Sequence, residues 1–109
     1  MVAASSVSAI NAQAASYTLA LSDIGKIVEV SNGSANTLTV PPNATVPFPV
    51  GTRITVVQTG AGQTTITAGA AVTVSKVAAT LKSLGQYAVI ELYQTAADVW
   101  ICSGALAAS

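Results

Sequence analysis

The fold is decided by the stretch SANTLTVPPNATVPFPVGTRITVVQTGAGQTTIT, residues 34–67, which holds two clusters of proline and one ionisable side chain, Arg53. Within it, NTLTV places Leu38 and Val40 on one face and threonines on the other. A period of two is typical of a half-buried strand. The run RITVVQT repeats the arrangement, so the stretch predicts two strands on either side of a proline-rich segment.

The proline-rich segment between the two strands cannot itself be a central strand, because proline has no N–H to donate to a sheet. We predict an ordered loop that folds back as a lid over an open end of the core. Its apolar residues are Val46, Phe48 and Val50. The favoured interpretation of Phe48 is a core lid, and contact of this loop with another subunit is the alternative.

The rest of the chain contains further runs rich in Val, Ile, Thr and aromatic residues, which suit a pleated surface. They are YTLAL, KIVEV, QTTIT, AVTVS, YAVIELYQ and DVWICSG, and Gly, Pro, Asn and Ser separate them. We predict an all-β fold, a compact antiparallel β-sandwich or barrel of about seven to nine short strands. NTLTV, QTTIT and AVTVS share threonine patterning, but their spacing and turns differ, so no repeat is predicted.

The chain divides into an N-terminal arm, a β domain and a short C-terminal tail, which we place at residues 1–15, 16–104 and 105–109. The arm is rich in Ala, Ser, Asn and Gln. Such a segment is either a flexible leader or an extended arm that orders on a partner. In the second case Val7 and Ile10 are its expected anchors.

The composition is unusual in its charge. Charged residues make up 7% of the 109 residues and the formal net charge is zero, whereas an ordinary soluble domain has roughly 25% charged residues. Such a surface is poorly protected against association, and we expect a homo-oligomer that buries low-charge faces. The few cations are scattered and matched by carboxylates, which argues against a nucleic-acid partner. No window is continuously apolar for long enough to predict a membrane span.

Residues with catalytic chemistry are scarce, and we predict no enzyme, cofactor or metal site. The chain has no histidine, and its single cysteine, Cys102, is expected to be buried and inert. The Gly-rich run TGAGQTT lacks the lysine of a phosphate loop. The four carboxylates are interpreted as solvated or salt-bridged groups at strand edges and turns: Asp23, Glu29, Glu91 and Asp98.

The aromatic residues are expected to belong to the core. Tyr87 and Tyr93 share a parity with Val89, so they should lie on one face of a strand, with their hydroxyls at the rim. A carbohydrate-stacking platform is the alternative, although the clustered polar residues that usually accompany one are lacking.

Several short motifs resemble a module that recurs among particle proteins of tailed bacteriophages. They are Asp23-x-Gly25-Lys26, Asn36-Thr37-x-Thr39-Val40-Pro41, Phe48-Pro49-Val50-Gly51-Thr52, Gly62-Gln63-Thr64-Thr65 and Asp98-Val99-Trp100. The resemblance runs from about Tyr17 to Gly104.

This resemblance implies a structural protein of the virion rather than an enzyme. Because the module fills nearly all of the sequence, we expect a head-decoration or cement protein that binds the outer capsid surface and stabilises it. Its expected partners are copies of itself, as a trimer, and the major capsid protein, after synthesis in the host cytoplasm. The alternative is a tail-fibre or receptor-binding module. No individual binding residue is carried over from the resemblance.

Overall fold

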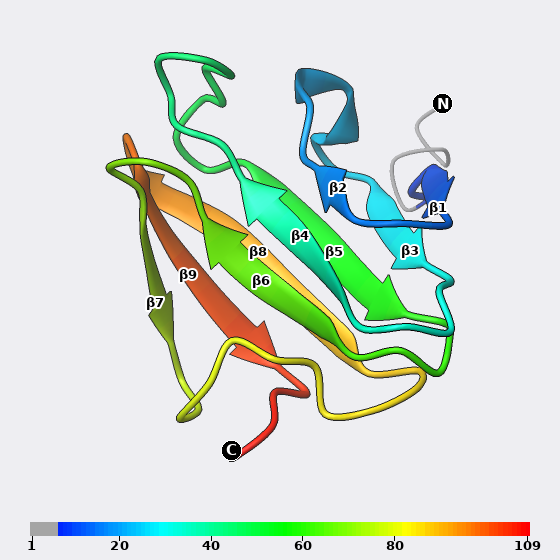
Figure 1. Ribbon diagram of the computed structural model, residues 1–109. Coiled ribbons are helices and arrows are strands. Elements are labelled where there is room, and N and C mark those ends of the chain that lie inside the picture. The colour runs from blue at the N-terminus through cyan, green and yellow to red at the C-terminus, as the bar shows by residue number, and fades with distance from the viewer. Residues whose placement is uncertain (1–6) are drawn as a thin grey trace.

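The computed structural model describes residues 7–109, which form nine short strands and a single 3₁₀ turn, η2 (Figure 1). Each run predicted to be a strand contains one, so the strand-rich expectation is confirmed. One further strand, β1, lies in the segment predicted to be an arm. The elements are β1 Ile10–Gln13, β2 Tyr17–Thr18, η2 Leu21–Asp23, β3 Ile27–Val30, β4 Asn36–Val40, β5 Arg53–Gln58, β6 Thr64–Ala68, β7 Thr73–Lys76, β8 Val89–Ala96 and β9 Val99–Gly104.

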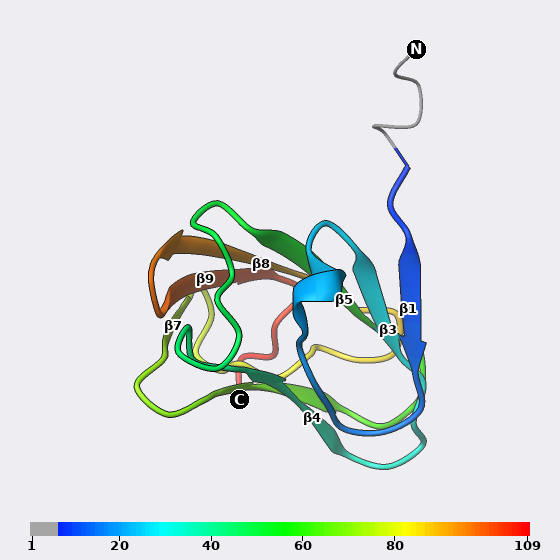
Figure 2. The same cartoon turned by 90° about the horizontal axis from the view of Figure 1, so that it is seen from above.

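The strands form two sheets that face each other (Figures 1 and 2). The larger sheet has six strands in the order β1-β3-β5-β8-β9-β7, and the smaller has three in the order β2-β4-β6. Both sheets contribute to one buried cluster, with Ile54 and Leu92 from the larger and Leu38 and Ile66 from the smaller. These are the residues that period-two alternation assigns to the inner face.

Most neighbouring strands run parallel, so the prediction of an antiparallel fold is wrong for the greater part of both sheets. Only β5 with β8, and β8 with β9, are antiparallel. Parallel neighbours need a crossover connection. Here a strand of the opposite sheet provides it, because β1 to β6 alternate between the two sheets along the chain (Figure 1). A period-two pattern carries no information on strand direction.

The structure contains a repeat that the sequence pattern did not predict. Strand β5 lies beside β3, and β6 lies beside β4, and both pairs share an offset of 28 residues (27 to 55 and 36 to 64). The turns that follow β3 and β5 stack on each other at this offset. A Cβ atom on Gly62 would overlap the carbonyl oxygen of Ser34, and one on Gly60 would overlap the backbone nitrogen of Asn32. Only glycine allows the backbones to approach so closely.

The proline-rich loop closes one end of the core, which confirms the lid interpretation of Phe48. That side chain is 3% exposed, and its ring meets Trp100 edge to face, with centroids 5.4 Å apart. Val46 packs partly against the core, whereas Val50 is 64% exposed. Phe48 is therefore engaged within its own chain, whereas Val50 faces outward.

The predicted arm is shorter than expected. Residues 1–6 lie outside the described part of the chain, but Ile10–Gln13 form β1 and pair in parallel with β3. These four residues therefore belong to the sheet, since they satisfy backbone hydrogen bonds along its edge, and the division of the chain at residue 15 stays a prediction. Val7 and the residues that follow it lead into this strand, and Val7 is 76% exposed.

The stacked turns give a direct test of the repeat. Replacing Gly62 with Ala should lower the free energy of unfolding by about 1–3 kcal/mol, because the added methyl group forces the two backbones apart. Gly33→Ala is the matched control, since a Cβ there meets nothing within 4 Å, and it should change stability by less than about 0.5 kcal/mol. Urea unfolding measures both. Equal effects of the two substitutions would contradict close stacking at Gly62.

Candidate functional site

The outer face of the six-stranded sheet is the main candidate for an interaction surface. Its strands place apolar side chains on the outside as well as in the core. Exposed examples are Ile10 at 59%, Val89 at 47% and Tyr93 at 43%, and Ile27 and Ile101 are half-buried on the same face. A face of this kind, on a chain with few charges, suits contact with another protein.

Two tyrosines depart from the prediction that they pack in the core. Tyr93 lies on the outer face of β8, and Tyr87, just before that strand, is 70% exposed. Tyr93 shares a side of β8 with Val89, as their parity predicted, but it is the side that faces away from the smaller sheet. Tyr87 also has a positive φ of 70°. A bulky residue in this conformation is strained by about 1–3 kcal/mol, and such strain is often found at functional positions.

The free edge of β1 is the second feature of this surface. The carbonyl groups of Ala9 and Gln13 accept hydrogen bonds from β3 and the residue that follows it, so by alternation the N–H groups of Ile10 and Ala12 point away from the sheet. Strand β1 contains no proline, charge or bulge, and these are the devices that usually block an exposed edge. In Figure 2 the chain that leads into β1 extends beyond the rest of the sheet. As far as residues 7–109 are concerned, this edge is therefore available to another strand.

A buried polar network holds β1 in place. Asp23 is fully buried, which corrects the prediction that it is solvated or salt-bridged. Its carboxylate accepts hydrogen bonds from the Tyr17 hydroxyl at 2.7 Å, from the Asn11 side-chain amide at 2.7 Å and from the Ala20 backbone at 2.8 Å. Gln13 donates in turn to Asn11 at 2.8 Å. Because Asn11 and Gln13 belong to β1, the network fixes the edge strand against β2 and η2.

The sequence carried a partial signal for this network. Asp23 follows Ala20 by three residues, the spacing at which a carboxylate reaches back to a free N–H at the start of a helical turn. Because this spacing is local, the contact between Asp23 and Ala20 could have been predicted from the sequence. The contribution of Asn11 could not, because it depends on β1 lying in the sheet.

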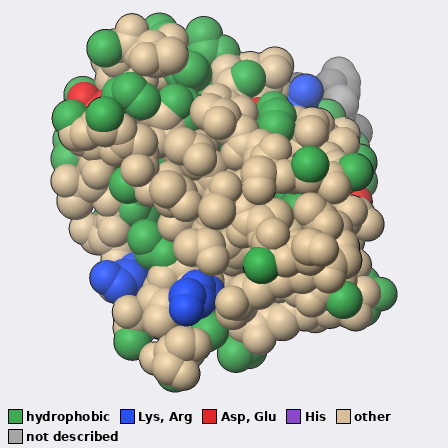
Figure 3. All heavy atoms as spheres, viewed as in Figure 1, with side chains coloured by type: hydrophobic (Ala, Val, Ile, Leu, Met, Phe, Trp, Pro, Cys, Tyr) green, Lys and Arg blue, Asp and Glu red, His purple; other side chains and the backbone are tan. Residues whose placement is uncertain are grey.

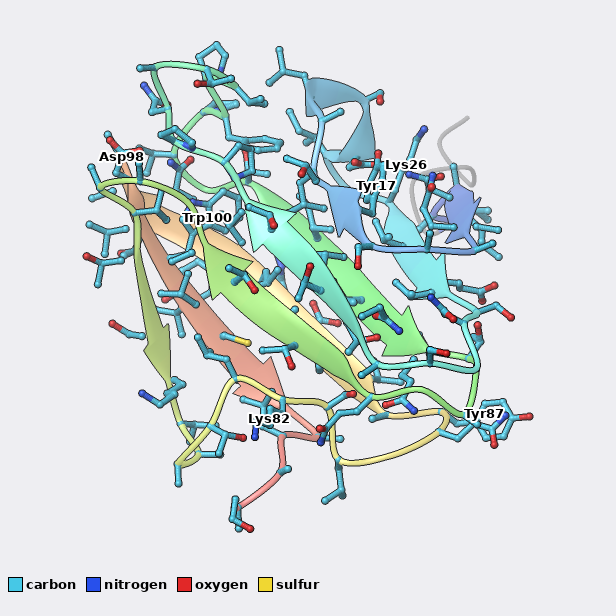
Figure 4. All side chains as sticks on the ribbon, viewed as in Figure 1. Tyr17, Lys26, Lys82, Tyr87, Asp98 and Trp100 are labelled. Carbon is cyan, nitrogen blue, oxygen red and sulfur yellow. The ribbon has the colours of Figure 1, made fainter. Side chains whose placement is uncertain are left out.

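The outer face of the smaller sheet differs in chemistry. Its register aligns Thr18 with Thr39 and Thr67, and Thr37 with Thr65. Figure 3 looks onto this side and shows mostly backbone and side chains that are neither charged nor hydrophobic, with scattered apolar side chains and a few Lys or Arg side chains. In Figure 4, Lys82 lies towards the opposite end of the molecule from Lys26 and Tyr17. The strands of this face therefore offer mainly hydroxyl and methyl groups.

Conventional catalytic or metal-binding groupings do not occur in the part of the chain that the structure describes. Residues 7–109 contain no cluster of three or more Cys, Asp or Glu side chains that could hold a metal ion. Cys102 is buried, as predicted, and burial raises the pKa of its thiol to about 11. A protonated thiol is a poor nucleophile. None of the helical turns in the same residues is long and apolar enough to cross a membrane.

No protein-family model, curated protein or solved structure matches the chain. Function is therefore inferred from the surface described above and from the resemblance carried by the short motifs.

The Tyr17–Asp23 contact predicts how stability depends on pH. Burial, with the hydrogen bond to Asp23 and the charge of that carboxylate, raises the pKa of Tyr17 above 10.0, although Asn11 opposes the shift. Burial also raises the pKa of Cys102 from 9.0 to about 11. Groups with raised pKa values bind protons more tightly in the folded state. Their contribution to the free energy of unfolding is fully present below the pKa values of the unfolded state. It is lost as the pH rises through the pKa values of the folded state.

We therefore expect the free energy of unfolding to be steady up to about pH 9 and to fall as the pH rises towards and beyond 11. Tyr17→Phe should be less stable at pH 7 by about 1–3 kcal/mol, because Asp23 loses a buried hydrogen bond. It should also lose less stability than the parent protein between pH 9 and 11. Urea unfolding at several pH values measures both effects, and parallel pH profiles would exclude a contribution of Tyr17.

Proposed function

We propose that this protein is a non-enzymatic structural component of a tailed-bacteriophage particle, a decoration or cement protein of the capsid surface. The observation that carries the proposal is the joint exposure, within residues 7–109, of an unblocked strand edge and of several apolar side chains on the outer face of the same sheet. An edge and an apolar face together suit a protein that binds other protein surfaces and performs no chemistry. The motifs that resemble phage particle modules support the same class.

The proposed mechanism is mechanical. The chain assembles into a homotrimer, and each copy adds β1, which begins at Ile10 and follows Val7, to a strand of the major capsid protein. Main-chain hydrogen bonds provide the affinity in such β-augmentation, and exposed side chains provide the specificity. Three equivalent sites in a trimer bind with avidity, so no deep pocket is needed. In this proposal the two facing sheets form a β-sandwich, which is the rigid body that carries the binding edge. Neither nucleic acid nor a cofactor takes part.

A second function is favoured by the exposed tyrosines. Tyr87 and Tyr93 are both exposed, and a carbohydrate-stacking platform requires accessible aromatic rings. A tail-fibre or receptor-binding module would use them to bind a cell-surface glycan. The loops near Asn43 and Gly60 offer less for this role, because the Asn43 backbone is held by Asp98 at 2.7 Å and Gly60 packs on Asn32.

The copy number on purified particles separates the two functions. Particles from the source are isolated on a density gradient, and this chain is quantified against the major capsid protein. We expect a ratio of the order of one to one, because a decoration protein covers equivalent sites over the whole shell. A few copies to a few tens per particle would favour the tail. Absence from the particles would overturn both functions.

The edge of β1 can be blocked without disturbing the fold. Ala12→Pro removes an N–H that points away from the sheet, so the ladder with β3 keeps its hydrogen bonds. We expect the variant to fold with nearly the parent stability and to bind heads at least about tenfold more weakly, because avidity amplifies the loss of one main-chain hydrogen bond in each copy. Ala12→Val keeps the N–H and is the control. Head binding measured by co-sedimentation that is equal in the two variants would exclude this edge.

A further inference from the structure

An open depression of about 430 Å³ lies on the outer face of the six-stranded sheet, next to the chain that leads into β1. It is lined by Ser8, Gly25, Lys26, Arg53, Thr55 and Glu91. Thr55 and Glu91 form its floor, since they are opposite each other on β5 and β8 and point outward. Ser8 contributes the rim nearest the arm. The depression therefore adjoins the edge to which a partner strand is proposed to add.

The backbone brings two cations to this place. The turn before β3 meets the start of β5, where the Gly25 N–H donates to the Arg53 carbonyl at 2.9 Å and the Thr55 N–H donates to the Lys26 carbonyl at 3.1 Å. Lys26 and Arg53 are half of the four cations in the whole sequence. The other two are distant in the fold, with Lys76 at the end of the opposite edge strand and Lys82 beside β6. On a chain with 7% charged residues, this is an unusual local concentration.

The single carboxylate in the depression has a fixed orientation. The Thr55 hydroxyl donates to a carboxylate oxygen of Glu91 at 2.8 Å. With two cations and one carboxylate, the formal charge of the lining residues is +1. A ligand that carries negative charge is attracted to the two cations. If the same ligand also has N–H groups, the Glu91 carboxylate can accept a hydrogen bond from one of them. A peptide with acidic side chains provides both features, whereas a free anion provides only the first.

We propose that this depression binds an acidic, extended peptide segment, with its carboxylates on Lys26 and Arg53 and a backbone N–H on Glu91. This identification of the partner rests on the proposed function. If that function holds, the segment belongs to the capsid protein and continues the strand that adds to β1. The charge contacts are exposed and individually weak, so they select the partner and its register, while the strand pairing supplies most of the affinity.

The site is tested with the full chain, labelled with ¹⁵N, and a capped peptide that alternates Asp with Ala. We expect saturable shifts of the Ser8, Gly25 and Thr55 amides. Binding should weaken as the ionic strength rises from about 0.01 M to about 1 M, because the Debye length falls from about 30 Å to about 3 Å. Inorganic phosphate is the second probe. Phosphate binding tighter than peptide binding would overturn the assignment to an acidic peptide.

The chain offers a matched pair of charge variants. The double substitution K26Q and R53Q removes both cations of the depression, and K76Q with K82Q removes the same charge elsewhere. We expect the first variant to weaken peptide binding about tenfold or more and the second to change it by less than about twofold. Equal weakening in both variants would show that only the overall charge matters, and would overturn the site.

Particle binding then separates this inference from the proposed function. If K26Q with R53Q loses both peptide and head binding, the depression recognises the capsid. If it loses the peptide but binds heads like K76Q with K82Q, the inferred partner is wrong and the decoration function stands. If the parent chain binds the peptide but no particles carry the chain, the decoration function is wrong, and so is the assignment of the peptide to a capsid protein.

Discussion

The structure depends on the close stacking of two turns, the one after β3 and the one after β5. Their backbones approach so closely that Gly60 and Gly62 leave no space for a side chain. This contact places β5 beside β3 in one sheet and β6 beside β4 in the other, both at the offset of 28 residues. Since a slip of one residue would turn every side chain to the opposite face, a single contact fixes the inner faces of two sheets at once.

The same stacking determines which polar groups are buried and which edge is left free. Below the stacked turns, Ser83 joins the two sheets, because it donates to Gln58 and accepts from the Thr64 backbone at 2.9 Å. Thr64 donates to Asn36 at 2.6 Å. On the other side of the larger sheet, β1 continues the parallel series, and within residues 7–109 no further strand lies beyond it. The Asp23 network compensates for its short length. An edge that is both open and firmly held is well suited to receive another strand.

The sequence predicted the strands well, because each depends on a local pattern. The alternation in NTLTV and RITVVQT, the prolines before Gly51 and the burial of Phe48 and Cys102 all follow from residues close together in the chain. The direction of the strands could not be predicted from these local patterns. The common offset of 28 residues, from β3 to β5 and from β4 to β6, indicates parallel neighbours only when the turns after β3 and β5 are known to stack. The burial of Asp23 could not be predicted, because it depends on a hydrogen bond from Asn11. Asn11 lies on a strand in a segment that composition alone suggested was an arm. The outward side of Tyr93 could not be predicted from parity, which groups residues on a face without saying which face is inside.

The scarcity of charge changes what each charged group can do. Four carboxylates and four cations are present, and one carboxylate, Asp23, is buried in the network that holds β1. On an ordinary surface, with roughly a quarter of residues charged, two neighbouring cations are screened by many others and select little. Here Lys26 and Arg53 line one depression with a single carboxylate, Glu91, whereas the other two cations lie across the fold. A low-charge surface therefore combines two requirements of a binding protein: apolar area for contact, and a local charge pattern distinct enough to set the register of the partner.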